Sequence, residues 1–162
     1  MVACVRSLNR YPDRDFLALR VDLAAYLARE SGADFLTAEQ IWAGNGANGA
    51  MLPLLQAFGG PDRVALGFEP SYSMHPILAA GTNTGWVGVH RPDDFVLTSA
   101  LAVAAVEAPP PDVVFVTSPT NPTAPLPPPP LTAALYPPGA RSGVVRRALA
   151  RAPPPAQALA AV

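Results

Sequence analysis

Residues 113–123 read VVFVTSPTNPT, and this stretch decides the fold. Its first five residues form an apolar, valine-rich run that is typical of a strand buried on both faces of a sheet. Residues 63–68 and 84–90 have similar character, and the runs alternate with segments of helical periodicity. Short buried strands that alternate with helices predict an α/β fold, with a largely parallel sheet flanked by helices and joined by right-handed crossovers.

The clearest predicted helix spans residues 13–31, where apolar residues recur at helical spacing and Gly32 follows as a C-cap. Three further helices are expected, at residues 50–58, 72–80 and 98–107. Pro53 is compatible with the first of these only within its first turn, where the missing N–H of proline costs little.

Charge and cysteine usage exclude several classes of function. The formal net charge is −1, from 11 basic and 12 acidic residues, so the chain has no general electrostatic attraction for nucleic acid or an anionic membrane. Cys4 is the only cysteine, which excludes an intrachain disulfide and a thiolate zinc site. The sequence has neither a secretory signal nor an apolar run long enough for a membrane helix, so we expect a cytoplasmic location.

Composition divides the chain near residue 123. Of the 21 prolines, 15 lie at or beyond Pro109, and arginine is the only charged residue type after Asp112. We therefore expect residues 8–123 to form a globular domain and residues 124–162 to form an irregular tail rich in proline, alanine and arginine. Two short pieces of structure are expected within that tail, a turn or two of helix at 131–136 and the beginning of a strand at 142–145.

Three loops carry the candidate functional residues, and each follows an expected strand. Residues 44–49 (GNGANG) follow the apolar run 41–43; such a loop can cradle a phosphate with backbone N–H groups, although it is more often only a turn. Tyr72 either stacks on a planar ligand or packs at the edge of the core. Asn121 stands between two prolines, so its amide can be aimed at a ligand oxygen or can simply belong to a turn.

His75 lies beside Ser71 and Ser73, but no acidic residue can be assigned to orient its ring, so we expect a satisfied or exposed histidine rather than a catalytic one, and we expect the same of His90. The chain also lacks metal-ligand spacing, a Walker loop and a dinucleotide fingerprint.

In order, the motifs RYPD (10–13), NGANG (45–49), PSYSMHP (70–76) and SPTNPTA (118–124) resemble those of pyridoxal-phosphate-dependent, fold-type-I aminotransferases, most closely the histidinol-phosphate type. The resemblance is clear from residue 8 to residue 123 and fades afterwards. It implies a partial large domain that binds pyridoxal 5'-phosphate and belongs to an incomplete member of the family. The family transfers an amino group between histidinol phosphate and 2-oxoglutarate in histidine biosynthesis.

The resemblance also implies roles for five residues. Ala47 and Asn48 would give backbone N–H groups to the cofactor phosphate. Tyr72 would stack on the pyridine ring, and Asn121 would bond its phenolic oxygen. Tyr11 would reach the phosphate in the neighbouring subunit, which implies a homodimer with shared sites.

The chain departs from the family at several positions. Gly49 replaces a glutamate, Ala124 replaces a glycine, and Arg146 lies where the family has the aspartate that pairs with the pyridine nitrogen. All 11 basic residues are arginines, so the lysine that holds the cofactor covalently is absent from this chain. The chain alone is therefore predicted to be inactive, and we hypothesise that the sequence after about residue 145 is out of frame or degraded.

Alternative assignments remain open at this stage. An aromatic-amino-acid aminotransferase or a phosphothreonine decarboxylase shares these loops, and a fragment of either is a runner-up. A non-catalytic, pseudogene-like product is a second class. A binding module that uses the proline-rich tail is a third.

Overall fold

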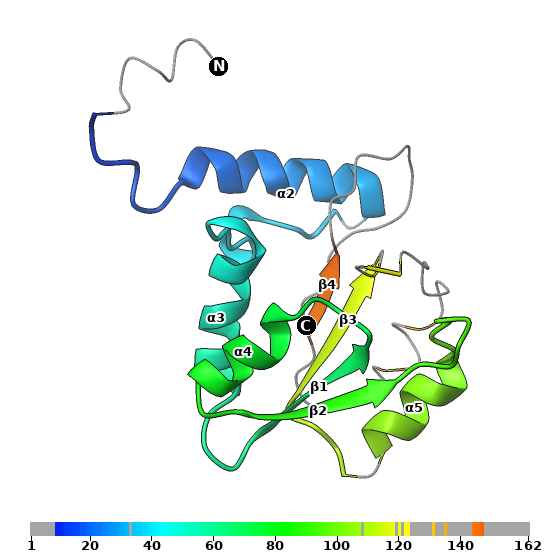
Figure 1. Cartoon of the computed structure of the whole chain (residues 1–162). Helices are drawn as coiled ribbons and strands as arrows, with labels where there is room; N and C mark the ends of the chain where they lie inside the picture. The colour runs from blue at the N-terminus through cyan, green and yellow to red at the C-terminus, as the bar shows by residue number, and fades with distance from the viewer. Residues whose placement is uncertain are drawn as a thin grey trace. The chain divides into compact units, whose positions relative to one another are not determined.

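The computed structural model describes residues 9–32, 34–107, 109–118, 120, 122–123, 131, 135 and 144–147. These residues fall into two compact units, one that ends at Ala43 and one that begins at Gly44. The second contains the sheet and the loops that the sequence singled out (Figure 1).

The first unit consists of α2 (Leu17–Ser31) and a short 3-10 helix, η1 (Ala38–Gln40). Gly32 adopts a left-handed conformation, with φ 69°, and closes α2 as the predicted C-cap. Arg20 lies on α2 and donates from Nε to the backbone oxygen of Ala38 at 2.9 Å, which fastens the two helices together.

Helix α2 begins later than the sequence pattern predicted, at Leu17 rather than at residue 13. The carboxylate of Asp13 accepts hydrogen bonds from the backbone N–H groups of Asp15 and Leu17, each at 3.2 Å. Asp13 therefore satisfies donors at the start of the helix instead of lying within it.

The second unit contains a four-stranded sheet in the order β2-β1-β3-β4, and every neighbouring pair is parallel. Its strands are β1 (Val64–Glu69), β2 (Gly85–His90), β3 (Val113–Ser118) and β4 (Val144–Arg147). The predicted α/β class and parallel sheet are confirmed. All four carboxyl ends consequently lie at one edge of the sheet, where ligands collect in folds of this kind.

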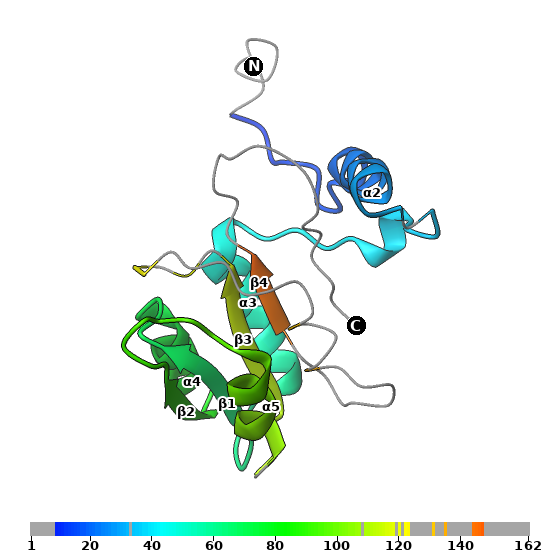
Figure 2. The same cartoon turned by 90° about the vertical axis from the view of Figure 1, so that its right-hand side faces the viewer.

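Helices cover both faces of this sheet, as Figures 1 and 2 show. On one face, α3 (Gly46–Phe58) and α4 (Met74–Gly81) pack over a core of Met51, Leu55, Ala65, Ala79, Val113 and Phe115. On the other face, α5 (Ser99–Glu107) packs over a second core of Leu66, Phe68, Leu97, Ala102, Val114, Val116, Leu131 and Leu135. Because successive side chains of a strand point to opposite faces, β1 and β3 contribute to both cores.

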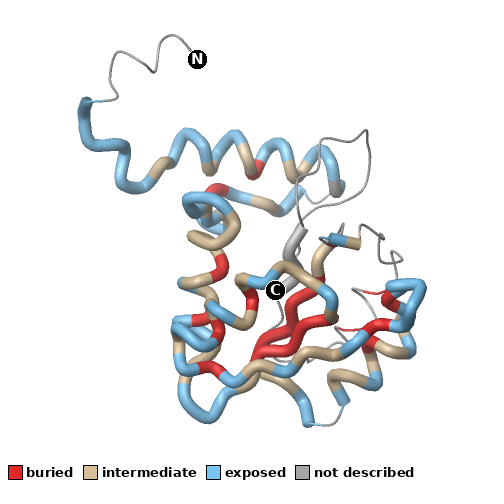
Figure 3. The backbone as a smooth tube through the Cα atoms, viewed as in Figure 1, coloured by how far each residue is buried: buried red, intermediate tan, exposed pale blue. Residues whose placement is uncertain are grey.

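Burial distinguishes the central strands from β2 (Figure 3). The four inner residues of β1 are all buried, whereas β2 alternates between exposed and half-buried positions. The continuous apolar run of β1 and β3 thus corresponds to strands with neighbours and helices on every side, as the sequence predicted.

Three sequence predictions about regular structure need correction. Residues 41–43 are not a strand, and no described strand pairs with them. Helix α3 begins at Gly46 instead of residue 50, so Pro53 lies inside the helix rather than in its first turn. There it removes the N–H that would bond the carbonyl of Gly49. Finally, the strand expected to begin at residues 142–145 is present as β4, but it begins at Val144 and extends through Arg147.

The other expected elements lie close to their predicted positions. Helix α4 begins at Met74 and includes Pro76 within its first turn, where proline is tolerated. Among the described residues, no helix combines the length and the apolar character needed to cross a membrane.

Candidate functional site

The loop after β1 and the first turn of α3 meet on the core beneath α3 and α4. Ala47 and Tyr72 are both half-buried and both pack against this core. Asn48, in the first turn of α3, approaches the Tyr72 hydroxyl with its amide nitrogen at 3.5 Å. Two of the three loops predicted from sequence are therefore brought together by the packing of the helices on the sheet.

The start of α3 is built to approach a ligand closely. A Cβ on Gly44 would lie 2.8 Å from backbone atoms of Gly49 and Ala50, so only glycine fits there. Gly46 has φ 69°, a conformation that favours glycine, and a Cβ at this position would meet nothing within 4 Å. The position that a Cβ of Gly46 would occupy is therefore open.

Among the described residues, no side-chain cap is found at this helix start. The N-cap residue Asn45 makes no side-chain capping bond, and the first turn has no acidic residue. The first N–H groups of a helix lack partners within the helix, and they carry partial positive charge. The first turn of α3, which includes Ala47 and Asn48, can thus bind an anion such as a phosphate.

The side chain of Asn48 has an unmet hydrogen-bonding group. Its Oδ1 atom is buried and has no hydrogen-bond partner among the described residues. Buried polar atoms in native proteins are nearly always paired. The amide nitrogen of the same side chain lies 3.5 Å from the Tyr72 hydroxyl, so Asn48 and Tyr72 offer polar groups next to the candidate anion site.

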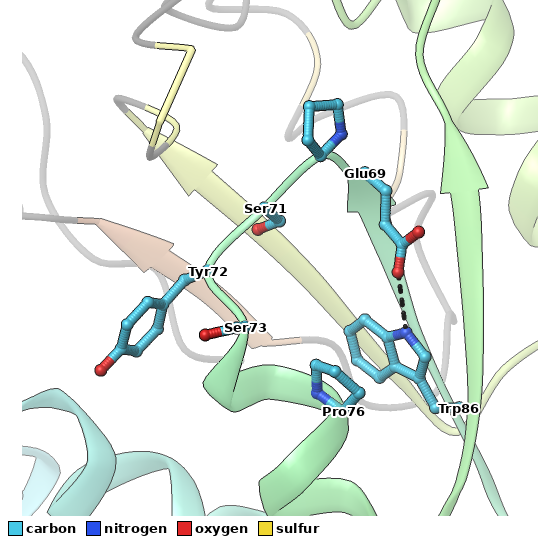
Figure 4. A pocket seen from close by; sticks show the side chains of 7 residues that line it. Glu69, Ser71, Tyr72, Ser73, Pro76 and Trp86 are labelled. Atoms are coloured by element: carbon cyan, nitrogen blue, oxygen red, sulfur yellow. Dashed lines mark hydrogen bonds between the residues drawn. The ribbon is translucent and has the colours of Figure 1, made fainter.

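Tyr72 is held at an angle by its neighbours. Its ring meets that of His75 edge-on, with centroids 5.7 Å apart and planes at 86°. Figure 4 shows the Tyr72 side chain directed away from the Glu69–Trp86 contact and its hydroxyl at the end of the ring furthest from the loop. An aromatic ring at the carboxyl edge of a parallel sheet can stack on a planar ligand.

His75 is buried and has side-chain partners, which agrees with the expectation of a satisfied histidine. It is 1% exposed, and its ring stacks on Phe115 of β3 with centroids 4.9 Å apart. Its Nδ1 atom lies 3.3 Å from the hydroxyl of Ser71. His90 is instead exposed, at 84% of its side-chain surface, and lies 4.0 Å from the Glu69 carboxylate.

A small cavity of about 210 Å³ lies behind the Tyr72 loop (Figure 4). The Trp86 indole donates to Glu69 Oε1 at 3.3 Å across its floor. A Cβ on Gly67 would lie 2.4 Å from Trp86, and one on Gly88 would lie 2.3 Å from Glu69. The paired glycines of β1 and β2 therefore let these two side chains lie flat on the sheet.

Arg91 is a functional candidate that the sequence pattern did not identify. Arg91 directly follows β2, is 7% exposed, and donates to residues of three different loops. Burial lowers the pKa of its guanidinium. Its position immediately after a predicted strand was the available signal, but sequence could not show which loops it would reach.

Three other residues that the sequence singled out are not among the described contacts between α3 and the Tyr72 loop. Asn121 lies outside the described residues, although its neighbour Thr120 is buried and donates to the backbone oxygen of Thr117 at 3.1 Å. Tyr11 belongs to the first unit and is fully exposed there. Arg146 lies opposite Thr117 in the register of β4 and β3, at the carboxyl edge of the sheet.

Comparison with known families settles the relationship. The model of the family described as aminotransferase class I and II matches residues 4–136. The chain belongs to this family. Family membership confirms the resemblance seen in the ordered motifs, and the family is pyridoxal-phosphate-dependent.

Individual relatives agree with this assignment. A histidinol-phosphate aminotransferase of Rhodococcus opacus (strain B4) is 58% identical over 118 residues, covering 73% of this chain and 31% of the relative. The N-succinyldiaminopimelate aminotransferase structure of Mycobacterium tuberculosis matches with a TM-score of 0.70 and 26% identity, over 83% of this chain and 36% of that one. The chain therefore spans about a third of the length of such relatives.

A third comparison bears on the fold alone. The histidinol-phosphate aminotransferase of Sinorhizobium meliloti, solved in complex with pyridoxal-5'-phosphate, matches with a TM-score of 0.60. Its identity is 21%, over 75% of this chain and 31% of that one. The shared fold is that of the fold-type-I aminotransferases.

The residues present fit non-covalent binding of the family's cofactor, pyridoxal 5'-phosphate. The uncapped first turn of α3 suits a phosphate, and the Tyr72 ring suits a planar pyridine. They do not fit covalent attachment of the cofactor, because this chain offers no lysine side chain to form a Schiff base.

Proposed function

We propose that this chain is the cofactor-holding front part of a histidinol-phosphate-type aminotransferase and that it binds pyridoxal 5'-phosphate non-covalently. The first turn of α3, with Ala47 and Asn48, holds the phosphate. Tyr72 holds the ring. The observation that carries the proposal is the meeting of these two elements on one core, at the carboxyl edge of a parallel sheet.

Substrate and reaction are proposed from the relatives. The relatives that are 58% identical are named histidinol-phosphate aminotransferases, and their similarity covers most of this chain. The bound cofactor would supply an electron sink for amino-group transfer between histidinol phosphate and 2-oxoglutarate. The contribution of these residues is to anchor the phosphate and orient the ring, while Asn121 donates to its phenolic oxygen.

We further propose that this chain does not catalyse the reaction by itself. It has no lysine to hold the cofactor covalently or to move the substrate proton. Arg146 at the end of β4 replaces the acidic residue of the family and disfavours a protonated pyridine nitrogen. Residues 8–123 would form the cofactor domain, and residues 124–162 would form the altered tail.

Assembly as a homodimer is part of the same proposal. Tyr11 is fully exposed in its own unit, so it is accessible to a second copy of the chain. In a dimer, its hydroxyl would donate to the phosphate bound by the partner.

The test is a titration of the purified chain with pyridoxal 5'-phosphate, followed by absorbance and tyrosine fluorescence. We expect saturable binding of one cofactor, much weaker binding of pyridoxal without the phosphate, and no cofactor fixed to the chain by borohydride. Addition of histidinol phosphate and 2-oxoglutarate should give no turnover. A folded chain that binds neither compound would refute the holding role, and turnover by the chain alone would refute the inactivity.

A further inference from the structure

We infer that Arg91 is a positioning residue of this site, which holds the Tyr72 loop and the loop after β3 at a fixed spacing. The inference rests on the proposed function, because it concerns how two parts of the cofactor site are kept in register. The site needs such a device, since Tyr72 and the loop after β3 leave the sheet from different strands, β1 and β3.

The contacts of Arg91 cross the carboxyl edge of the sheet. Its backbone N–H donates to the oxygen of Glu69 at 2.9 Å, and Nε points at the same oxygen at 3.4 Å. Nη1 donates to the oxygen of Phe95 at 2.9 Å. Nη2 donates to the oxygen of Pro70 and, at 3.2 Å, to the hydroxyl of Thr123. One side chain thus joins the loops that follow β1, β2 and β3.

These contacts need an arginine. Guanidinium presents five N–H donors in a rigid plane, whereas lysine offers a single nitrogen. Arg91 is 7% exposed, and no carboxylate among the described residues forms an ion pair with it. Its charge is therefore directed to three carbonyl oxygens and one hydroxyl, an arrangement that fixes loops and leaves little donor capacity for a ligand.

The residues that Arg91 contacts explain its expected effect on the site. Pro70 lies two residues before Tyr72, and Thr123 lies two residues after Asn121. In the proposed site, the ring of Tyr72 and the loop after β3 must both contact the same small planar ligand. Because a misplacement of about 1 Å is enough to weaken such a site, the spacing between these loops should govern cofactor affinity.

The first experiment compares Arg91→Lys with Arg63→Lys as a matched control. Arg63 precedes β1 at the opposite edge of the sheet, where it donates to the oxygen of Phe58 at 3.0 Å. All titrations with pyridoxal 5'-phosphate are made at a temperature where circular dichroism shows the proteins to be folded. Arg91→Lys should weaken binding about tenfold and alter the induced circular dichroism of the bound ring, because lysine cannot span the three loops. Arg63→Lys should stay within about twofold of the parent.

A second pair remains informative if Arg91→Lys does not fold. Thr123→Val removes the hydroxyl that Arg91 contacts while keeping the shape of the side chain, and Thr123→Ser keeps the hydroxyl. We expect about threefold weaker cofactor binding for Thr123→Val, since one hydrogen bond is lost, and nearly normal binding for Thr123→Ser. A folded Arg91→Lys or Thr123→Val protein with unchanged affinity and unchanged induced dichroism would overturn the inference.

Hydrogen exchange of the cofactor-free chain separates this inference from the proposed function. Thr123→Val should speed exchange in the Tyr72 loop, which Thr123 reaches only through Arg91 in the described contacts. If the parent chain binds no cofactor but this exchange accelerates, the proposed function fails and the Arg91 link stands. If the parent binds cofactor and neither affinity nor exchange responds, the Arg91 link fails alone.

Discussion

The carboxyl ends of β1 and β4 lie on the same edge of one parallel sheet, yet they carry different chemistry. The loop after β1 is fixed by hydrogen bonds from Arg91 and by the contact of Ser71 with His75. The end of β4 places Arg146 and Arg147 opposite Thr117 and Ser118 in the sheet register. In the proposed function, the β1 end holds the cofactor, and the β4 end carries arginine where the family resemblance implies an aspartate.

In the proposed function, the residues that bind the cofactor and the residues that would activate it lie on different strands of this sheet. Anchoring a phosphate and stacking a ring depend on backbone donors and an aromatic face, which the region from α3 to α4 supplies. Activation of the cofactor depends on a carboxylate near the ring nitrogen and on a lysine, and this chain has a different residue at the first position and no lysine. Substitutions at the two ends should therefore have unequal effects.

The largest expected effect comes from Tyr72→Ala, which removes the stacking ring from the β1 end. We expect the dissociation constant of pyridoxal 5'-phosphate to rise about tenfold or more, since an aromatic pair contributes about 1 kcal/mol beyond its buried area. Tyr72→Phe is the matched control, because it keeps the ring and removes the hydroxyl, which lies 3.5 Å from the Asn48 amide nitrogen. Equal losses in the two variants would contradict a stacking role.

A smaller effect is expected from Gly46→Ala at the start of α3. Gly46 has φ 69°, and an alanine in that conformation costs about 1 kcal/mol, which should disturb the donors of the first turn. We expect about fivefold weaker cofactor binding, measured by the same titration. Gly81→Ala in α4 is the control, since Gly81 has open space for a Cβ; a similar loss in both would show that the effect is general.

The smallest effect is expected from Arg146→Asp at the end of β4. A carboxylate there favours the protonated pyridine, so the absorbance of the bound cofactor should move toward its protonated form. Affinity should change by less than about threefold, because this end does not hold the cofactor. A tenfold gain would mean that the β4 end belongs to the holding site and would remove the distinction between the two ends.

Local patterns in the sequence were sufficient for much of the fold. The apolar runs of β1 and β3 predicted strands because each is buried on both faces, and Gly32 marked the end of α2. The predictions of secondary structure were wrong where the outcome depended on tertiary contacts rather than on the local sequence pattern. Residues 41–43 are apolar, but no strand in the described part of the chain pairs with them. Pro53 lies inside α3, where the packing of Met51 and Leu55 offsets its lost hydrogen bond.

Part of the candidate site could also be predicted from the sequence. Ala47, Asn48 and Tyr72 were identified from ordered motifs, and the structure brings them onto one core. Their roles toward the cofactor stay predictions, as do those of Asn121 and Tyr11. The unpaired Oδ1 of Asn48 could not be foreseen, because it depends on which side chains surround it after folding.

The sequence by itself determined that this chain has no lysine, that it carries the ordered motifs of an aminotransferase, and that its strands alternate with helices. Composition and local periodicity are properties of the chain, so folding is not needed to read them. Only the tertiary structure decided that α3 would present an open, uncapped first turn beside Tyr72 and that Arg91 would join three loops. Those arrangements depend on contacts between residues that are far apart in sequence, which become neighbours only when the parallel strands align.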